Sequence, residues 1–362
     1  MLSPCYWPEV RRGTERMLNG LSRRLIAHGH EVRLITSAPQ RRPTYAVEDG
    51  LRVLRLPRLP DGRFERRRLE HYVTHLPLSY AALRGWGADL AHAWFQTDAL
   101  VAARWRRRTG KPAVFSYMGV PDHPGLTLRR RRLEITVSAV KGVDAVVGVS
   151  RYVARQFERW LGVRDAHAIY PPIDLELFVP SPELRTDEPS ISCAAYADDG
   201  RKRVPLLIEA FAIVRKTHPR ARLLLQQPHS PELERRLSGP GVEWIDPGAD
   251  AAGLPALYAS SWVSVLPSFG DAFGMVLAEA LACGTPVVGT NRDALPEVID
   301  RPEIGRLFDD RGPEALAAAL LEAIELSQDP ATAAACRSRA EEFSPQRCAE
   351  AYEALYAEVL AR

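Results

Sequence analysis

Two carboxylates flank a glycine-containing segment in the second half of the chain. Asp271 and Glu279 are eight residues apart, within the stretch VSVLPSFGDAFGMVLAEALACGTPVV that covers residues 263–288. The pattern predicts a strand, a glycine loop and then a helix over residues 273–282. The first turn of such a helix offers unpaired N–H groups and the positive end of the helix dipole, which suit a diphosphate. Because eight residues span a little over two helical turns, both carboxylates can lie along one edge of a bound ligand.

The same stretch resembles the signature of glycosyltransferase family 4, whose members are retaining enzymes with the GT-B fold. The family pattern has a proline–serine turn, an acidic residue, Gly-Phe-Gly, a helix with Glu-Ala, and then Gly-x-Pro-Val-Val. Here residues 271–274, DAFG, stand where Glu-Gly-Phe-Gly is usual, while Glu279-Ala280 and the run 283–288 fit directly. A plain helix cap is the alternative role for Asp271, and the surrounding pattern argues against it.

The resemblance implies a role for each matching residue. Glu279 would bind the ribose hydroxyls of a nucleotide sugar, and Asp271 would contact the transferred sugar. Backbone N–H groups at the start of the helix would hold the diphosphate and the sugar. The further donor-binding residues implied in this segment are Phe273, Gly274, Met275 and Val276.

Cations for the diphosphate are expected in the run 198–203, DDGRKR. Lys202 stands where the family has a lysine, so the resemblance makes it a catalytic and donor-binding candidate. The place of the family arginine holds Tyr196, and Arg201 or Arg203 is expected to replace it. A solvated basic turn is the alternative for this run.

The first half of the chain resembles the family less closely. The segment from Tyr6 to Glu15 is similar to the family's first loop, and Gly13 there would let the backbone approach the donor. Met118 stands where the family often has a histidine near the reacting centre. Because a thioether cannot donate a hydrogen bond or transfer a proton, this departure leaves the acceptor chemistry open.

The net charge of +3 is unevenly distributed. Residues 1–180 contain 30 Lys+Arg against 17 Asp+Glu, and residues 181–362 contain 18 against 28. Such asymmetry indicates two domains with different partners. The basic half, with clusters at 63–68 and 129–132, suits a phosphate-bearing acceptor or an anionic membrane surface. Exposed helix ends on an arginine-rich surface are the alternative, and no motif for nucleic-acid binding accompanies the charge.

Composition indicates an ordinary globular protein, with 46% hydrophobic and 26% charged residues. The five cysteines are dispersed, which argues against a disulfide framework or a zinc site. The apolar runs are too short to cross a bilayer, and the start lacks the features of a signal peptide. We therefore expect a cytoplasmic protein, with a peripheral place at the inner face of the membrane as an option. No metal and no other cofactor is expected, because no D-x-D motif suited to a diphosphate is present.

Strand-like and helix-like segments alternate along both halves, which predicts an α/β protein with parallel sheets covered on both faces. The expected strands are 31–36, 51–56, 90–94, 113–117, 145–149, 192–196, 222–226, 242–245, 263–266 and 285–289. The expected helices are 14–28, 204–217, 254–259, 273–282, 313–326 and 345–361. Only residues 1–3 precede Pro4, so the first strand of the first half is expected to be a stub or to begin upstream.

These patterns and the resemblance together predict the GT-B architecture, with two Rossmann-like domains facing a central cleft. Residues 1–178 would bind the acceptor, with the helix at 346–362 packed back on them, and residues 179–345 would bind the nucleotide sugar. The expected reaction moves a sugar from a UDP- or GDP-linked donor to a glycan, a glycolipid or a small molecule, with retention of configuration. The alternatives are another enzyme class on the same fold, a non-catalytic subunit of an envelope-synthesis complex, and a nucleic-acid binder.

Overall fold

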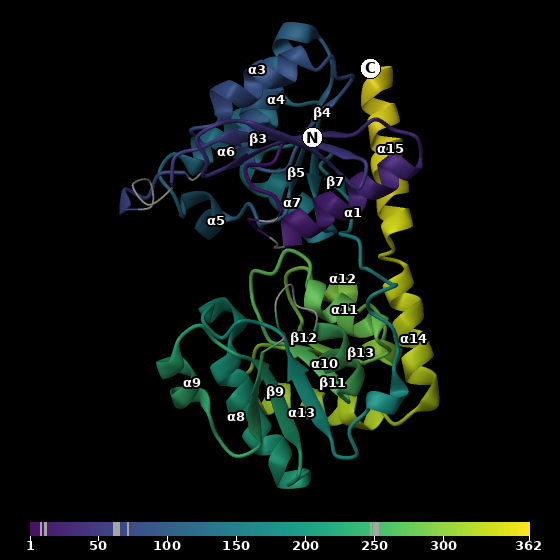
Figure 1. Cartoon of the computed structure of the whole chain (residues 1–362). Helices are drawn as coiled ribbons and strands as arrows, with labels where there is room; N and C mark the ends of the chain where they lie inside the picture. The colour runs from purple at the N-terminus through teal and green to yellow at the C-terminus, as the bar shows by residue number, and fades with distance from the viewer. Residues whose placement is uncertain (8, 11–12, 61–65, 71, 247, 249–252) are drawn as a thin grey trace. The chain divides into compact units, whose positions relative to one another are not determined.

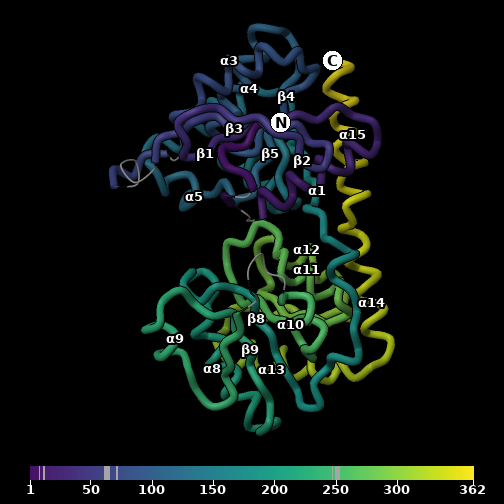
Figure 2. The backbone as a smooth tube through the Cα atoms, in the orientation of Figure 1, coloured from purple at the N-terminus to yellow at the C-terminus, as the bar shows by residue number. Residues whose placement is uncertain are grey.

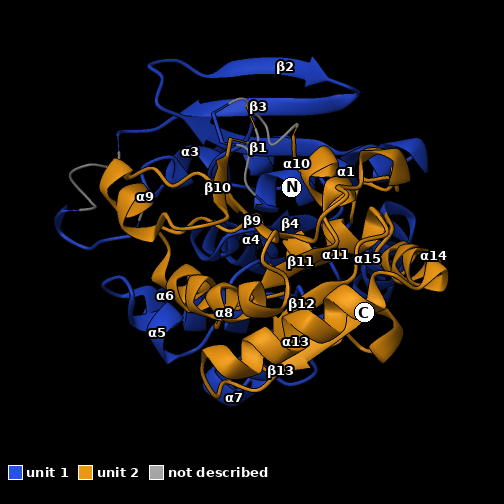
Figure 3. Ribbon diagram, turned by 90° about the horizontal axis from the view of Figure 1, so that it is seen from below, with its two compact units in different colours: residues 1–172, 345–362 blue, residues 173–344 orange. Residues whose placement is uncertain are grey.

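The computed structural model describes residues 1–7, 9–10, 13–60, 66–70, 72–246, 248 and 253–362. The chain divides into two compact units, unit 1 with residues 1–172 and 345–362, and unit 2 with residues 173–344 (Figure 3). The chain leaves unit 1 at residue 172 and returns to it with the last helix (Figure 2).

Unit 1 is built on a mostly parallel sheet. Its strands are β1 (Arg33–Ala38), β2 (Thr44–Glu48), β3 (Leu51–Pro57), β4 (Ala91–Ala93), β5 (Ala113–Tyr117), β6 (Ala145–Gly148) and β7 (His167–Ala168). The strands pair in the orders β1-β3-β2 and β4-β5-β6-β7, and β2 alone among these strands is antiparallel to its neighbour. Strands such as Ala145–Gly148 are buried along their whole length, as expected where both faces of a parallel sheet are covered.

The first three residues join these two groups of strands. Leu2 forms a parallel bridge to Ile35 of β1 on one side and to Ala93 of β4 on the other. Its N–H donates to the carbonyl of His92 at 2.8 Å, and its carbonyl accepts from the N–H of Trp94 at 3.0 Å. Through these two isolated bridges Leu2 lies between β1 and β4, in the place of a central strand.

Helices cover this sheet. They are α1 (Gly13–Ala27), α3 (Leu76–Gly85), α4 (Gln96–Thr109), α5 (His123–Thr127), α6 (Arg132–Gly142), α7 (Arg151–Leu161) and α15 (Pro345–Ala361). The apolar stripe of α1, with Met17, Leu18, Leu21 and Leu25, is buried, as the helical period predicts. The last helix, α15, lies beside α1 (Figure 1).

A buried histidine connects α15 to the sheet of unit 1 through hydrogen bonds. His92 of β4 is 1% exposed, and its two ring nitrogens lie 2.7 Å from Tyr356 Oη and 2.7 Å from Ser116 Oγ. The Ser116 hydroxyl also lies 2.9 Å from Tyr352 Oη. Burial, with a smaller effect of the amino group of Met1, holds the pKa of His92 well below its ordinary value, so the ring is neutral near pH 7.

Unit 2 contains a fully parallel sheet of six strands in the order β10-β9-β8-β11-β12-β13. The strands are β8 (Ser190–Cys193), β9 (Arg222–Gln226), β10 (Val242–Ile245), β11 (Val263–Leu266), β12 (Val287–Thr290) and β13 (Gly305–Phe308). In chain order this is 3-2-1-4-5-6, the order of a Rossmann fold. The point where the order reverses lies between β8 and β11.

The α-helices of unit 2 are α8 (Val204–Thr217), α9 (Pro231–Leu237), α10 (Leu254–Ser260), α11 (Met275–Ala282), α12 (Leu295–Val298), α13 (Pro313–Leu326) and α14 (Pro330–Glu341). Short 3₁₀ turns occupy Pro182–Leu184, Gly200–Lys202 and Pro302–Ile304. All six residues from Leu277 to Ala282 are buried, so α11 is a core helix. All five cysteines are buried thiols that form no disulfide bond.

The α/β class with parallel sheets is confirmed, and several elements match their expected ranges, including α8, β9 and α13. The strand expected over 192–196 is instead β8 at Ser190–Cys193, because the chain pairs with β9 and β11 only up to that point and then turns away. The expected ranges do not include several described elements, namely β2, β7, β13, α3 to α7, α9, α12 and α14. Among these, β2 and α14 show no clean period of two or of 3.6. Of the basic cluster noted at 63–68, residues 63–65 lie outside the described residues.

Candidate active site

Residues 267–274, which we call the donor loop, connect β11 to α11 at the carboxyl edge of the unit 2 sheet. Its two glycines have positive φ angles, 69° at Gly270 and 98° at Gly274. A Cβ at position 274 would also lie 2.7 Å from a methyl carbon of Leu295. The loop can therefore take this path because both positions lack a side chain.

Neighbouring strands hold the donor loop in place through its backbone. Thr290, at the end of β12, donates its hydroxyl to the carbonyl of Ser268 at 2.9 Å. The N–H of Phe269 donates to the carbonyl of Arg201 at 3.0 Å. These bonds fix the loop against the end of β12 and against the turn Gly200–Lys202, which follows β8.

Asp271 is the most strongly held side chain of the donor loop. Lys202 Nζ lies 2.8 Å from Asp271 Oδ1, and the hydroxyl of Ser268 donates to Asp271 Oδ2. The two charged side chains are 21% and 15% exposed, so solvent screens their attraction only in part.

This ion pair bridges the point where the strand order reverses. Lys202 belongs to the loop after β8, and Asp271 belongs to the loop after β11. In open parallel sheets, ligands bind at the carboxyl ends of the strands beside such a point. Two residues that are 69 positions apart in the sequence therefore meet where the fold favours a ligand.

The arginines of the run 198–203 are engaged with carboxylates. Arg201 bonds to both oxygens of Asp199, at 3.1 and 2.7 Å, and reaches the carbonyl of Gly270 at 3.4 Å. Burial tends to raise the pKa of Asp199, but the hydrogen bonds from Arg201 outweigh it and hold that pKa below its ordinary value. Arg203 donates to Asp310 at 2.5 Å, and its Nη1 is buried with no hydrogen-bond partner among the described residues.

Glu279 lies in the second turn of α11 and is 4% exposed. The hydroxyl of Tyr258 donates to Glu279 Oε2 at 3.2 Å. Burial, together with the negative charge of Glu279, raises the pKa of Tyr258 well above its ordinary value. The tyrosine therefore stays protonated and remains a donor to the carboxylate.

The other residues expected in this segment have different surroundings. Gly274 precedes the first turn of α11, and Met275 and Val276 begin that turn, where N–H groups have no partner within the helix. Phe273 is 3% exposed and packs edge to face against Phe343, with ring centroids 5.1 Å apart. Its side chain thus belongs to the core of unit 2.

Gly13 is the expected donor-binding residue that lies in unit 1, at the first position of α1. A Cβ at Gly13 would meet no atom within 4 Å among the described residues. The space beside its backbone is therefore open in unit 1, whereas the other expected residues gather in unit 2.

The sequence analysis did not name three residues that support the site: Ser268 within the donor loop, and Tyr258 and Asp293 outside it. Asp293 Oδ2 accepts the N–H of Gly270 at 2.6 Å, and Arg292 Nε lies 3.3 Å from the same oxygen. Asp293 itself has a φ of 57°, a conformation that aspartate tolerates better than most residues. Its signal in the sequence was weak, because a lone Asp after a strand is typical of any turn.

Comparisons with known proteins identify the family. The pattern of the family described as "Glycosyltransferase Family 4" matches residues 11–177, and that of "Glycosyl transferases group 1" matches residues 188–326. A D-inositol 3-phosphate glycosyltransferase of Paenarthrobacter aurescens is 31% identical over 291 residues, which cover 72% of this chain and 70% of that protein.

The chain belongs to glycosyltransferase family 4. A further relative of this family 4 glycosyltransferase is the GDP-mannose-dependent alpha-(1-6)-phosphatidylinositol dimannoside mannosyltransferase of Mycobacterium tuberculosis, 25% identical over 93% of this chain and 90% of that protein. The expectation that the chain is a glycosyltransferase using a nucleotide sugar is thereby confirmed.

Solved structures agree on the fold of this glycosyltransferase. Sucrose-phosphate synthase from Thermosynechococcus elongatus superposes with a TM-score of 0.78 at 23% identity, over 97% of this chain and 94% of that one. Anabaena Alr3699/HepE in complex with UDP-glucose gives a TM-score of 0.75 at 18% identity, over 99% and 98%. The expected GT-B fold of two Rossmann-like units is confirmed.

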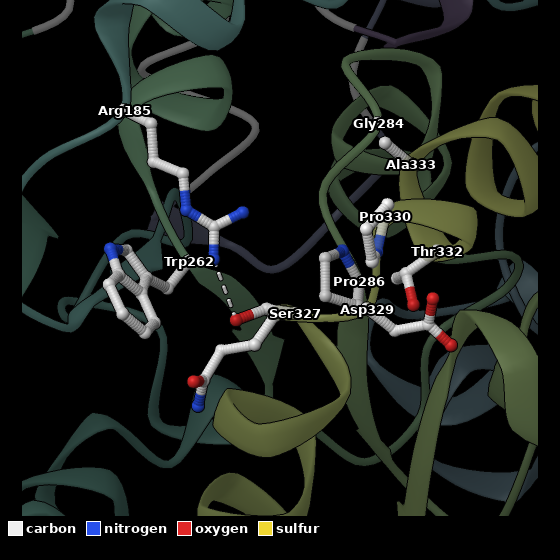
Figure 4. Close-up of a pocket in the computed structure, with 10 residues that line it drawn as sticks. Arg185, Trp262, Gly284, Pro286, Ser327, Asp329, Pro330, Thr332 and Ala333 are labelled. Carbon is white, nitrogen blue, oxygen red and sulfur yellow. Dashed lines mark hydrogen bonds between the residues drawn. The ribbon is translucent and has the colours of Figure 1, made fainter.

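A separate pocket of about 370 Å³ in unit 2 of this glycosyltransferase does not include the donor loop (Figure 4). It is lined by Trp262 and Pro286, which directly precede β11 and β12, so it lies at the amino edge of the sheet. Arg185 lies over the indole of Trp262 and donates to Ser327 Oγ at 2.9 Å.

The described residues of this glycosyltransferase contain neither a candidate metal site nor a helix able to span a membrane. Within them, no three or more His, Cys, Asp or Glu side chains are grouped so as to hold a metal ion. Of the helices described, none combines the length and the apolar composition that crossing a bilayer requires.

Proposed function

We propose that this glycosyltransferase transfers a sugar from a UDP- or GDP-linked donor with retention of anomeric configuration, and that unit 2 binds the donor. The observation that carries the proposal is the Lys202–Asp271 pair at 2.8 Å, at the reversal point of the sheet and beside the start of α11. The position unites a cation, a carboxylate and a helix N-terminus, which are the groups that a nucleotide sugar requires.

Each part of the donor has a matching group. Glu279, held by Tyr258, accepts hydrogen bonds from the ribose hydroxyls. The N–H groups of Gly274, Met275 and Val276 bind the diphosphate, and Lys202 neutralises part of its charge. Asp271 accepts from a hydroxyl of the transferred sugar, with its orientation fixed by Ser268.

In the proposed reaction the acceptor oxygen attacks the anomeric carbon on the face from which the diphosphate departs. The bond from that carbon to the phosphate oxygen breaks as the new glycosidic bond forms. The proton of the acceptor hydroxyl moves to the departing phosphate oxygen. The protein positions the two substrates and stabilises the negative charge of the leaving group, mainly through Lys202 and the start of α11.

Because Lys202 and the helix start supply positive charge at the diphosphate, we propose that transfer needs no metal ion. The rate in the presence of excess EDTA should equal the rate without it. A rate that falls with EDTA and recovers with added Mg²⁺ or Mn²⁺ would contradict this part of the proposal.

For the acceptor we propose a lipid-linked or phosphorylated polyol of the cell envelope. The named relatives act on inositol 3-phosphate and on phosphatidylinositol dimannoside. The first 180 residues carry an excess of 13 positive charges, 30 minus 17, which favours an acceptor that bears phosphate.

The donor site can be tested by thermal shift of the whole chain with UDP, GDP and ADP and their common sugars. A nucleotide at about 100 times its Kd stabilises the folded state by about 2.7 kcal/mol, which a melting curve detects. We expect a shift with UDP or GDP that Glu279→Gln removes. Glu325→Gln, on the exposed surface of α13, is the control with the same change of charge and should keep the shift.

The outcomes separate the possibilities. A shift that both variants keep would place the ribose elsewhere, and no shift with any nucleotide in folded protein would favour the non-catalytic alternative. Where transfer is measured, ¹H NMR of the first product gives its anomeric configuration. A product of inverted configuration would overturn the retaining mechanism.

A further inference from the structure

The strand β2 forms one side of unit 1 and has a single partner in the sheet. It pairs with β3 in an unbroken antiparallel register, from Thr44 opposite Arg55 to Glu48 opposite Leu51. Figure 3 shows β2 along the outer edge of unit 1, with β3 on its inner side. No other described strand pairs with β2, so the sheet has an open edge there.

The turn between β2 and β3 fixes which backbone groups face this open edge. It consists of Asp49 and Gly50, with φ angles of 49° and 83°, as in a tight hairpin of type I′. Such a turn is closed by a hydrogen-bonded pair, here the one that includes Glu48, and bonded and non-bonded pairs then alternate along the strand. The N–H and C=O groups of Tyr45 and Val47 therefore point away from β3.

The side chains of β2 do not protect the open edge from pairing. Natural edge strands often carry lysine, proline or a bulge, each of which hinders the addition of another strand. The range Thr44–Glu48 contains no lysine or proline, and its register with β3 has no bulge. Tyr45 and Val47 are 59% and 62% exposed and lie on the same face of the strand. An exposed apolar edge of this kind favours the addition of a further strand.

The charges around β2 are complementary to themselves in the antiparallel direction. Arg41 and Arg42 precede the strand, are exposed, and form no ion pair with another described residue. Glu48 and Asp49 end it, and each pairs with an arginine of its own chain. The Asp49 pair is exposed and therefore weak, so this carboxylate can bind a second cation. A two-fold axis at Ala46 would place the arginines of each copy beside the acidic end of the other.

The same axis also pairs the open backbone groups. With Ala46 opposite Ala46 of the second copy, Tyr45 of each copy lies opposite Val47 of the other. Both residues have outward N–H and C=O groups, so each of these pairs forms two hydrogen bonds. Each pair also joins an aromatic and a β-branched side chain on one face, which is a favourable combination across strands.

We propose that β2 is the interface of a homodimer, in which the β2 strands of two copies pair antiparallel and join two sheets into one. The interface uses the same edge of both copies, so assembly through it stops at two chains. A strand of another protein would find the same backbone groups but not the matching order of charges. The strand contains no residue of the proposed donor site, so the inference is independent of the proposed function.

Sedimentation equilibrium of the whole chain tests the dimer. The chain has a mass of 40.3 kDa, and the average mass should rise toward twice this value between roughly 1 and 200 μM protein. Because so short an interface gives a weak dimer, the rise should reverse on dilution. The mass of a single chain at every concentration would overturn the proposal, and a mass that rises beyond two chains would contradict the closed pair.

Val47→Pro tests the backbone pairing. Proline removes the outward N–H of this residue from both copies, whereas the N–H groups that bond to β3 remain. We expect the Kd of the dimer to rise about tenfold to a hundredfold, because two hydrogen bonds are lost. Val47→Thr keeps the N–H and the branched shape and should dimerise nearly like the parent. If Val47→Pro dimerises like the parent, the interface lies elsewhere and the proposal is wrong.

Charge reversal tests the register. Arg41→Glu with Arg42→Glu brings like charges together at both ends of the paired strands and should weaken the dimer about tenfold at low salt. Asp49→Arg should weaken it too, and arginine takes a positive φ elsewhere in this chain, as at Arg131 and Arg203. An equimolar mixture of the two proteins should recover most of the affinity, because the mixed dimer again pairs opposite charges.

A matched variant controls for net charge. Arg235→Glu with Arg236→Glu, at exposed positions of α9, changes the charge equally and should dimerise like the parent. Equal weakening by this control, or no recovery in the mixture, would rule out pairing through β2 in the proposed register. The thermal shift with nucleotide should be unchanged in all these variants, which shows that each protein is folded and that the dimer is separate from the donor site.

Discussion

Lys202 and Asp271 form the charged pair around which the proposed donor site is arranged. Each is mostly shielded from water, so removing one leaves the other poorly compensated. The hydrogen bond from Ser268 limits the rotation of Asp271 and directs the carboxylate. The proposed function therefore depends on a few side chains that already have their ion-pair or hydrogen-bond partners in the structure.

Replacement of Lys202 should affect the diphosphate most. We expect Lys202→Met to reduce nucleotide affinity about tenfold to a hundredfold, because a charge-assisted contact of this kind contributes about 1.5–3 kcal/mol. Lys216→Met, at an exposed site on α8, is the matched control and should bind like the parent. Isothermal titration with UDP and GDP measures both variants, and an unchanged Kd for Lys202→Met would remove this lysine from the site.

Asp293 should act through Gly270 and not by touching substrate. Asp293→Gly removes the carboxylate without strain, because glycine accepts the φ of 57°. We expect kcat to fall about tenfold, since the donor loop loses the acceptor for the Gly270 N–H. Asp293→Asn keeps an acceptor oxygen and should recover most of the rate. Steady-state kinetics with donor and acceptor varied separately provide the test, and equal loss in both variants would instead indicate a need for the charge.

At the scale of elements, α11 connects the donor loop to the core. The helix is buried from Leu277 onward, which fixes its direction, and Gly274 sets the turn that exposes its first N–H groups. The strand before it and the strand after it are parallel neighbours in the sheet, so β11, α11 and β12 form one strand–helix–strand unit. A displacement of the first turn of α11 would move all of its unpaired N–H groups together.

Gly274→Ala tests this element. The new Cβ would require a φ of 98° and would lie 2.7 Å from Leu295, so we expect a loss of about 1–3 kcal/mol of stability and weaker nucleotide binding. Gly239→Ala is the control, because its Cβ would meet no described atom within 4 Å. Melting temperature and nucleotide Kd should change together in the first variant, and an unchanged Kd would separate the helix start from the donor site.

At the scale of the whole chain, the C-terminal helix returns to unit 1 and closes its core. The hydrogen-bonded group formed by His92, Tyr352 and Tyr356 is buried. A positive charge on the His92 ring would therefore have no solvent to stabilise it. The folded state thus binds no proton at this ring in the range where an exposed histidine does. This gives the stability of unit 1 a dependence on pH.

Below about pH 6.5 the unfolded chain takes up a proton at His92 and the folded chain does not, so stability falls as the pH falls. The slope from this group approaches about 1.4 kcal/mol per pH unit. Calorimetric melting between pH 7.5 and pH 5.5 measures the fall. His92→Gln should lower the melting temperature at every pH and reduce its dependence on pH. It should not abolish that dependence, because the buried amino group of Met1, whose pKa burial lowers to about 5, adds a slope of the same sign. His229→Gln, at a 76% exposed side chain, should keep the parent slope. Equal slopes in all three proteins would contradict the account.

Periodicity along the chain predicts the strands and helices in which it is unbroken, such as β9, α8 and α13, and the stretch at 263–288 indicates the family. Those signals are local, because a helix face or a glycine loop depends on residues that are only a few positions apart in the sequence. The same locality explains why Asp271, Glu279 and Lys202 could be named before their geometry was known.

Contacts between residues far apart in the sequence follow only from the folded structure. The pairing of Lys202 with Asp271, the bond from Asp293 to Gly270, and the ion pair of Arg132 with Glu70 all join segments that are 23 to 69 residues apart. The order of strands in the sheet brings these segments together, and that order follows from packing the whole chain. A sequence pattern reflects residues that are neighbours along the chain. These contacts depend instead on which strands pair and on where each strand ends.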